Sequence, residues 1–185
     1  MPLIIKKPTF MNGGQVYGHP PPPPPDTLGQ EYGGGYYVGT TTSLDGSSYY
    51  LIVAPNATGC ACCQWKTTLS TTVGATSTVD GYANTYGPMD NTTHPAGNWT
   101  ATRTIGSFSD WYFPSRDEIK TLYTNRNTVP VGERYNTGDQ YYWSSTESAS
   151  SPTQRALRIC FCNGSFGNVT KNTLSRVRAV RRVPI

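Results

Sequence analysis

The sequence predicts an α+β fold in which a loop-rich antiparallel sheet is accompanied by one or two helices. Gly, Ser, Thr, Asn and Tyr dominate the composition and charged residues make up only 14% of it, a mixture that suits strands and turns. Asn163-Gly164, the strongest two-residue hairpin signal, lies between two stretches rich in β-forming residues. A clear helix start occurs at Ser115. With 185 residues, the chain suits one domain with an extension.

The first 32 residues differ in composition from the rest, and we expect them to form an N-terminal attachment tail to a single domain over residues 33–185. Six consecutive prolines, Pro20 to Pro25, favour a stiff polyproline II spacer of about 3 Å per residue. An apolar group precedes this spacer and is expected to attach the domain to a larger assembly. It consists of Leu3, Ile4, Ile5 and Phe10. The alternative interpretation is a disordered tail.

The first part of the domain is predicted to contain a β-hairpin. Residues 36–42 and 48–54 have strand character, and between them lies the turn sequence Leu44-Asp45-Gly46. Pro55 ends the second strand, because proline has no amide hydrogen to donate to a ladder.

Helix signals are concentrated in the middle of the chain. Ser115 and Glu118 form a capping box: the Ser side chain accepts a hydrogen bond from the N–H three residues on, and the Glu side chain reaches back. Apolar residues follow at helical spacing, and the helix should end before Thr128-Val129-Pro130. Residues 80–86 suit a short helix, whereas residues 91–104 are expected to form an exposed loop.

The last third of the chain is predicted to form a small antiparallel sheet with Trp143 in its core. Residues 141–147 form the strand that carries this side chain, and residues 156–162 and 165–170 pair across the Asn-Gly turn. Residues 175–183 alternate, so that apolar and basic side chains should point to opposite faces. The apolar set contains Val177 and Ala179, and the basic set contains Arg176 and Arg178.

Five cysteines occur in two groups, and buried free thiols are their expected state. The groups are Cys60, Cys62, Cys63 and Cys160, Cys162. On one strand, residues 160 and 162 would share a face and be poorly placed to bridge each other. A bridge between the two groups is the second interpretation. A metal site is the third, because the spacing is not that of structural zinc sites.

Charge and hydropathy narrow the classes of partner. The net charge is +4, and from Ser148 onward there are seven Lys or Arg and no acid. We expect these basic strands to pair with the acidic middle of the chain, the alternative being a basic face for phosphates or anionic glycans. No nucleic-acid-binding module matches, so nucleic acid is not an expected partner. No apolar run is long enough for a membrane span, and Lys6 and Lys7 follow the first apolar residues, the reverse of a signal peptide. We therefore expect synthesis in a cytoplasm without membrane insertion.

No catalytic residue, metal site or cofactor is expected. Neither His19 nor His94 has a partner in the sequence that would complete a catalytic triad. The carboxylates have expected structural roles: Glu118 in its cap, Asp110 in a turn where it bonds its own backbone, and Glu147 against an Arg of the final strand.

Several stretches, taken in chain order from about Gly34 to Val183, resemble one family. They are Tyr50–Pro55, Asp80–Thr85, Phe108–Glu118, Tyr142–Glu147, the Asn163-Gly164 turn and Val177–Val183. Together they resemble the C-type-lectin-like domain of bacterial collagen-like adhesins and phage tail proteins. That domain is similar at fold level to the formylglycine-generating sulfatase modifiers.

The resemblance implies a C-type-lectin-like fold and a non-enzymatic protein of the phage virion surface. The expected role is a tail-fibre or adhesin tip that binds a host glycan or protein receptor. A homo-oligomer, with a trimer expected, would be attached to other virion proteins by its tail. Two alternatives remain: a capsid decoration or structural joint protein, and an oxidoreductase of the formylglycine-generating type. The spacing and flanks of Cys160 and Cys162 do not match the catalytic pattern of that enzyme, and the calcium-ligand pattern of lectins is missing.

The turns and loops around the C-terminal sheet are the expected receptor-binding surface, because lectin-like relatives display their variable surface there. Arg, Asn and aromatic side chains on turns are free to contact a partner. The candidates are Trp99, Arg155, Arg158, Asn163, Phe166, Asn168 and Asn172. For Phe166, inward packing beneath the Asn163-Gly164 turn is the competing interpretation.

Overall fold

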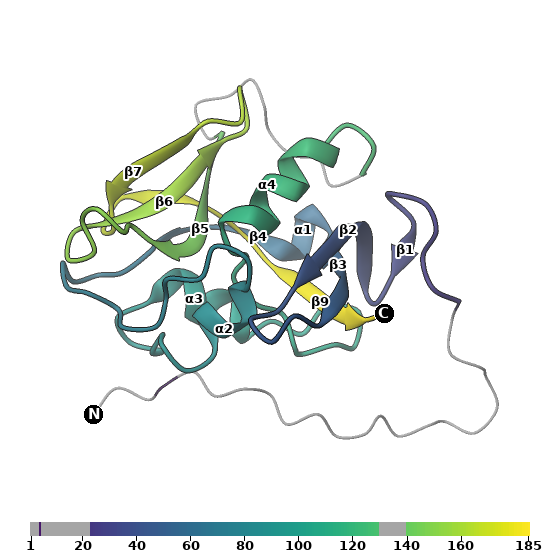
Figure 1. Cartoon of the computed structure of the whole chain (residues 1–185), viewed down its shortest axis with the longest axis horizontal. Coiled ribbons are helices and arrows are strands. Elements are labelled where there is room, and N and C mark those ends of the chain that lie inside the picture. Colours follow the sequence, from purple (N-terminus) through teal and green to yellow (C-terminus); the bar gives the residue numbers. More distant parts are fainter. Residues whose placement is uncertain (1–3, 5–22, 130–139) are drawn as a thin grey trace.

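The computed structural model describes residue 4, residues 23–129 and residues 140–185. Two sheets, four short or medium helices and long connections make up this part of the chain (Figure 1). The predicted α+β class is confirmed. The expected attachment residues Leu3, Ile5 and Phe10 lie outside the described residues, while Ile4 is exposed and forms an isolated antiparallel bridge with Asp90.

The first sheet has the strand order β1-β2-β3-β9 and is antiparallel throughout. Its strands are β1 (Glu31–Tyr32), β2 (Gly35–Thr42), β3 (Ser48–Val53) and β9 (Val180–Pro184). The predicted hairpin is therefore confirmed as β2 and β3. Its turn contains Gly46 at φ 85°, a left-handed conformation that glycine adopts without a Cβ penalty.

The second sheet has the strand order β4-β8-β5-β6-β7. Its strands are β4 (Cys60–Gln64), β5 (Tyr141–Glu147), β6 (Arg155–Cys160), β7 (Phe166–Thr170) and β8 (Leu174–Arg178). The β6–β7 hairpin around the Asn-Gly turn is confirmed, with Gly164 at φ 75°. Two details differ from the prediction: β5 and β8 pair in parallel, and β4 joins the sheet from far upstream.

The C-terminal segment is divided between the two sheets and is not one alternating strand. β8 pairs with β4 and β5, β9 pairs with β3, and Ala179 lies between them (Figure 1, yellow). Arg178, predicted on the basic face, still belongs to β8, where it pairs with Cys60, but it does not face solvent. Arg178 is fully buried and donates to the Ala54 carbonyl at 2.8 Å and to Asn56 Oδ1 at 3.1 Å.

Three short helices fill the connections: α1 (Asn56–Gly59), α2 (Gly81–Thr85) and α3 (Pro95–Ala101). The prediction for α2 is confirmed, and its N-cap Asp80 accepts a hydrogen bond from Ala83 N at 2.8 Å. The expectation of an exposed loop over residues 91–104 is wrong. Pro95 provides a favourable first helical position, and Ala96, Gly97 and Thr100 are buried.

The longest described helix is α4 (Arg116–Asn125), which begins with the predicted capping box. Glu118 is 2% exposed, and its carboxylate joins four elements of the fold. Oε1 accepts from Tyr112 Oη at 2.6 Å and from Thr41 Oγ1 at 3.0 Å, and Oε2 accepts from Ser115 N at 2.7 Å and Gly81 N at 3.1 Å. Burial raises the pKa of Glu118 above its usual value.

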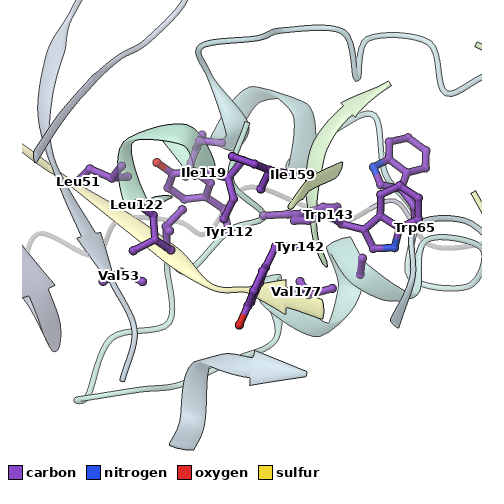
Figure 2. Packing of buried hydrophobic residues seen from close by; sticks show 14 of the residues in the cluster. Leu51, Val53, Trp65, Tyr112, Ile119, Leu122, Tyr142, Trp143, Ile159 and Val177 are labelled. Atoms are coloured by element: carbon purple, nitrogen blue, oxygen red, sulfur yellow. The ribbon is translucent and has the colours of Figure 1, made fainter. Parts of the chain in front are cut away.

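One hydrophobic core connects the two sheets and α4. Figure 2 shows its side chains running from Leu51 and Val53 of β3, past Leu122 of α4, to Trp143 and Trp65. Trp143 is 0% exposed, which confirms its predicted place in the core, and its Nε1 donates to the Cys63 carbonyl at 3.2 Å. Trp65 is equally buried and donates to the Ser144 carbonyl at 2.8 Å.

The cysteine groups differ in oxidation state. Cys160 and Cys162 form a disulfide, so the expectation of free thiols is wrong for this pair. β6 ends at Cys160 and the chain turns immediately afterwards, so strand alternation does not apply. Their Cα atoms are 5.3 Å apart, within the range that a disulfide spans. Cys60, Cys62 and Cys63 remain thiols, as expected, but none of them is buried: Cys60 and Cys63 are half-buried and Cys62 is exposed.

Candidate functional site

A polar recess of about 280 Å³ lies between the second sheet, the start of α4 and residues 76–78. We call it the hydroxyl pocket, because five hydroxyl side chains line it together with a guanidinium, an amide and a leucine. These side chains are Thr76, Thr78, Thr146, Ser148, Ser150, Arg116, Asn168 and Leu157. Glu147 and Ala149 complete the lining.

One wall of the hydroxyl pocket comes from the β6–β7 hairpin. Leu157 and Asn168 are direct partners in the antiparallel register, so their side chains lie on one face of the sheet. Arg155 belongs to the same face two residues earlier and is exposed. On this face Ile159 is buried and Arg155 is exposed to solvent. The hydroxyl pocket lies between these two positions, at Leu157.

Thr146 connects the other two walls. Its Oγ1 donates to the Ser77 carbonyl at 2.8 Å and accepts from Arg116 N, in the first turn of α4, at 3.0 Å. The Arg116 side chain lies at this rim, where Nε donates to Asp117 Oδ1 at 2.7 Å. Both side chains are over two fifths exposed, so this ion pair contributes little to stability. Among the described residues, the Arg116 Nη groups have no hydrogen-bond partner and can donate to a ligand.

The remaining rim is the turn after β5. Ser148 N donates to the Arg155 carbonyl at 3.1 Å, and Ser148 Oγ accepts from Ser151 N at 3.3 Å. The Ser148 and Ser150 hydroxyls are 3.2 Å apart. Ser148 is buried and orders the turn, whereas Ser150 is exposed, so its hydroxyl can donate to or accept from a polar ligand.

A buried ion pair supports the floor of the hydroxyl pocket. The Glu147 carboxylate accepts from Lys171 Nζ through Oε1, and Thr72 N donates to the same oxygen at 2.7 Å. This corrects the expectation that Glu147 meets an Arg of the final strand. Lys171 also donates to the carbonyls of Ser70 at 2.8 Å and Pro152 at 2.7 Å. Glu147 Oε2 is buried and has no hydrogen-bond partner among the described residues.

A second lysine fixes the same loop from the other side. Lys66 Nζ donates to the carbonyls of Ser70 and Thr71 at 3.2 and 3.1 Å and to Thr72 Oγ1 at 2.9 Å. Burial lowers the pKa of both Lys66 and Lys171. The loop carbonyls compensate the buried ammonium groups, which makes residues 66–72 a rigid support for the pocket.

His94 extends this buried network, so the expectation that it has no partner is wrong. Its Nε2 lies 2.9 Å from Thr72 Oγ1, and its Nδ1 lies 3.0 Å from Asp90 Oδ2. Burial lowers the pKa of His94 to about 4, although Asp90 acts in the opposite direction. The imidazole is therefore neutral near pH 7 and links two loops.

Asp110 likewise has a tertiary partner. It forms an ion pair with Arg181 of β9, which corrects the expected bond to its own backbone. The turn prediction considered only neighbours in sequence, whereas this contact joins residues from distant parts of the chain.

The predicted receptor residues do not gather in one place. Arg155 and Asn168 share the face that carries the hydroxyl pocket. Phe166 is half-buried against the main core, as the competing interpretation had it. Asn163 is exposed in the hairpin turn, where its Oδ1 accepts from Ser165 N at 3.0 Å and Ser165 Oγ at 2.7 Å.

The other candidates lie elsewhere on the domain. Arg158 points to the opposite face of β6, where it donates to Ser175 Oγ at 2.9 Å and lies 4.2 Å from the Tyr141 ring centroid. Asn172 is exposed in the turn before β8. Trp99 is half-buried on α3, with the Arg103 guanidinium 5.0 Å from its ring centroid.

Sequence reasoning missed most of the hydroxyl pocket. The overlooked residues are Thr76, Thr78, Arg116, Thr146, Ser148 and Ser150. The available signal was the density of hydroxyl residues in two stretches, 76–78 and 144–151. That signal alone does not reveal that the two stretches face each other.

Comparison with known proteins adds one positive finding. The family model described as the Lcl C-terminal domain matches residues 54–181, which is more than half of the chain. No curated protein matched the sequence. Among the described residues, no group of three or more His, Cys, Asp or Glu side chains could hold a metal ion. No described helix is both long and apolar enough to span a membrane.

Proposed function

The chain belongs to the Lcl C-terminal domain family, and on that premise we propose that it is a non-enzymatic receptor-binding protein of a phage virion surface. In this proposal it forms a tail-fibre or adhesin tip and binds a host-cell glycan through the hydroxyl pocket. The observation that carries the proposal is the composition of that pocket: hydroxyls, one amide and one guanidinium surround a single leucine on a rigid floor.

This lining suits the chemistry of a sugar. Each sugar hydroxyl both donates and accepts, and Ser, Thr and Asn side chains offer the same two roles. Leu157 provides an apolar surface for the C–H face of a ring, and Arg116 can donate to ring or carboxylate oxygens. Pre-formed sites with a few placed polar groups bind small ligands with little ordering cost.

The ionisable groups of the fold support binding over catalysis. Glu118 holds a helix cap together, Glu147 compensates Lys171, and His94 links two buried loops. Each is committed to contacts that maintain the structure. His94 does lie between Asp90 and the Thr72 hydroxyl, but that hydroxyl is buried and accepts from Lys66, so a substrate cannot reach it in this state. Cys160 and Cys162 are joined to each other, so neither provides a thiol to the oxidoreductase alternative in this state.

The test compares two exposed asparagines in the full chain. Asn168→Ala removes the amide of the hydroxyl pocket, and Asn172→Ala removes an exposed amide outside it. Binding is measured on a glycan array and then by titration of the glycan that binds. Loss of one ligand hydrogen bond costs about 1–3 kcal/mol, so Asn168→Ala should weaken Kd about tenfold at ~1.4 kcal/mol per decade.

The control and the stability measurement make the result decisive. Asn172→Ala should bind like the parent, and both variants should melt near the parent temperature, because surface substitutions usually change stability by less than ~0.5 kcal/mol. Equal binding by all three proteins would remove the hydroxyl pocket from receptor binding. A defect of Asn168→Ala in particle assembly instead of binding would support the structural joint alternative.

A further inference from the structure

A second recess, larger and different in chemistry, lies where β1 turns into β2. It has a volume of about 500 Å³, within the range of about 300–1,000 Å³ common for ligand pockets. We call it the aromatic groove. Its walls are Tyr32, Tyr36, Pro55 and Phe108, its base is the turn Gly33–Gly35, and Glu31 lies at its edge.

The glycine turn and Phe108 fix the shape of the aromatic groove. Gly34 has φ 84°, and a Cβ at this position would lie 2.6 Å from Phe108 Cδ2, so a glycine is needed for this close contact. Arg181 contacts both the glycine turn and Phe108. Its Nη1 donates to the Gly33 carbonyl at 3.2 Å, and its guanidinium lies 3.9 Å from the Phe108 ring centroid. Asp110 neutralises this arginine. The groove is therefore pre-formed.

The lining of the aromatic groove suits a proline-rich segment. Proline rings pack between flat aromatic side chains, and the polyproline II conformation is already extended and ordered before it binds. The Glu31 carboxylate is exposed and has no hydrogen bond or ion pair with the described residues, so it can accept from a polar or basic group next to the prolines. In this chain His19 directly precedes the six prolines.

The described prolines of the same chain's run lie outside this groove. Pro23 and Pro24 are exposed, Pro25 is buried, and none of the three lines the groove. After Pro25 the chain turns, with Gln30 N donating to the Thr27 carbonyl at 3.1 Å, and enters β1 directly. A stiff run that is already fixed outside the groove at its last proline cannot bend back into it.

We propose that the aromatic groove binds the prolines before Pro25, Pro20 to Pro24, of a second copy of this chain. Each copy then offers one run and receives another, which is a head-to-tail contact between different surfaces. Such contacts form closed rings when the rotation closes. The expected trimer would have this origin. The proposal is independent of the hydroxyl pocket, and failure of glycan binding does not affect it.

The test measures the mass of the full chain and two variants by analytical ultracentrifugation over a concentration series. The run variant replaces Pro20 to Pro24 with serine and leaves the groove intact. The groove variant carries Glu31→Lys and Tyr32→Ser and leaves the run intact. Tyr141→Ser, at an aromatic side chain that is 38% exposed and outside the groove, is the matched control.

The expected result has three parts. The parent and the control form the same oligomer, each variant sediments as a monomer, and an equal mixture of the two variants forms a dimer. The mixture is the sharpest measurement, because only an intact run from one chain in an intact groove of the other can join them. Glu31→Lys alone, at an exposed side chain, serves as a second groove variant and should weaken association about tenfold.

Two outcomes would overturn the proposal. A monomeric parent at every concentration would rule out a second copy as the occupant and assign the groove to another protein. An oligomer that persists in a folded groove variant would locate the contact elsewhere, whatever the run variant does. Circular dichroism shows whether each variant is folded. If the double groove variant does not fold, the association measured for Glu31→Lys alone tests the proposal.

Discussion

Replacing Lys171 with methionine should strongly destabilise the domain, because it removes the only ammonium group that contacts Glu147 in the described part of the chain. Methionine keeps most of the apolar stem but removes the Nζ that lies 4.7 Å from the Trp65 ring centroid. It also leaves the Glu147 carboxylate with one remaining donor, Thr72 N, and with Oε2 still without a partner. A buried charge without compensation is among the costliest defects that a side-chain substitution produces.

The magnitude follows from burial. The side chains of Lys171 and Glu147 are 0% and 1% exposed, so solvent does not screen the charge that remains. Removing one partner of such a pair costs about 3–5 kcal/mol. Glu147→Gln should cost less, about 1–3 kcal/mol, because Lys171 keeps the carbonyls of Ser70 and Pro152 as acceptors. The loss of stability in the double variant should be smaller than the sum of the two single losses by about 1 kcal/mol or more.

Urea unfolding, followed by tryptophan fluorescence, measures these differences, since Trp65 lies 4.7 Å from Lys171 Nζ. Lys120→Met is the matched control: Lys120 also lies over an aromatic ring and donates to a carbonyl, but it is half-buried and has no carboxylate partner among the described residues. It should cost less than about 1 kcal/mol. A loss below 1 kcal/mol for Lys171→Met, or strict additivity in the double variant, would refute the reasoning.

Three further changes test other parts of the fold by the same unfolding assay. Trp143→Ala should cost about 3–5 kcal/mol, and an unchanged Tm would contradict its place in the core. Folding lowers the pKa of His94 from 6.5 to about 4, so as pH decreases the unfolded chain binds a proton before the folded chain does. The free energy of unfolding should therefore drop by about 2 kcal/mol between pH 7 and pH 5. His94→Gln should remove most of this dependence. Gly34→Ala should reduce stability more than Gly46→Ala, because both glycines have φ near 85° but only Gly34 faces Phe108. Equal losses would show that the Phe108 side chain moves to accommodate the methyl group.

The sequence predicted the elements whose causes are local. The capping box at Ser115 and Glu118 depends on atoms within one helical turn, and the β6–β7 turn depends on the conformation of Asn163-Gly164. The α3 helix could not be predicted in this way, because its sequence contains Gly97 and several poor helix formers. It is held by tertiary packing instead: a Cβ on Gly97 would lie 2.4 Å from Met89 Sδ.

The sequence also did not predict which basic residue each buried acidic residue contacts. Acidic residues were correctly expected to have structural roles, but Glu147 meets Lys171 and Asp110 meets Arg181 through contacts that depend on the complete fold. The candidate site shows the same division. Asn168 could be placed on an accessible strand, whereas Thr76 and Arg116 reach the pocket only because distant segments fold against the sheet.

The division of the C-terminal segment between two sheets has a consequence for biosynthesis. Residues 174–184 supply the strand that joins β4 to β5 and the strand that covers the edge of β3. The ribosome adds these residues after all the other described strands, so neither sheet can be completed until residues 174–184 have been synthesised. Until then the nascent chain carries unpaired strand edges, which are templates for aggregation. A nonsense mutation shortly before residue 174 would leave both sheets open, and we expect such a product to be degraded instead of accumulating as a shortened domain.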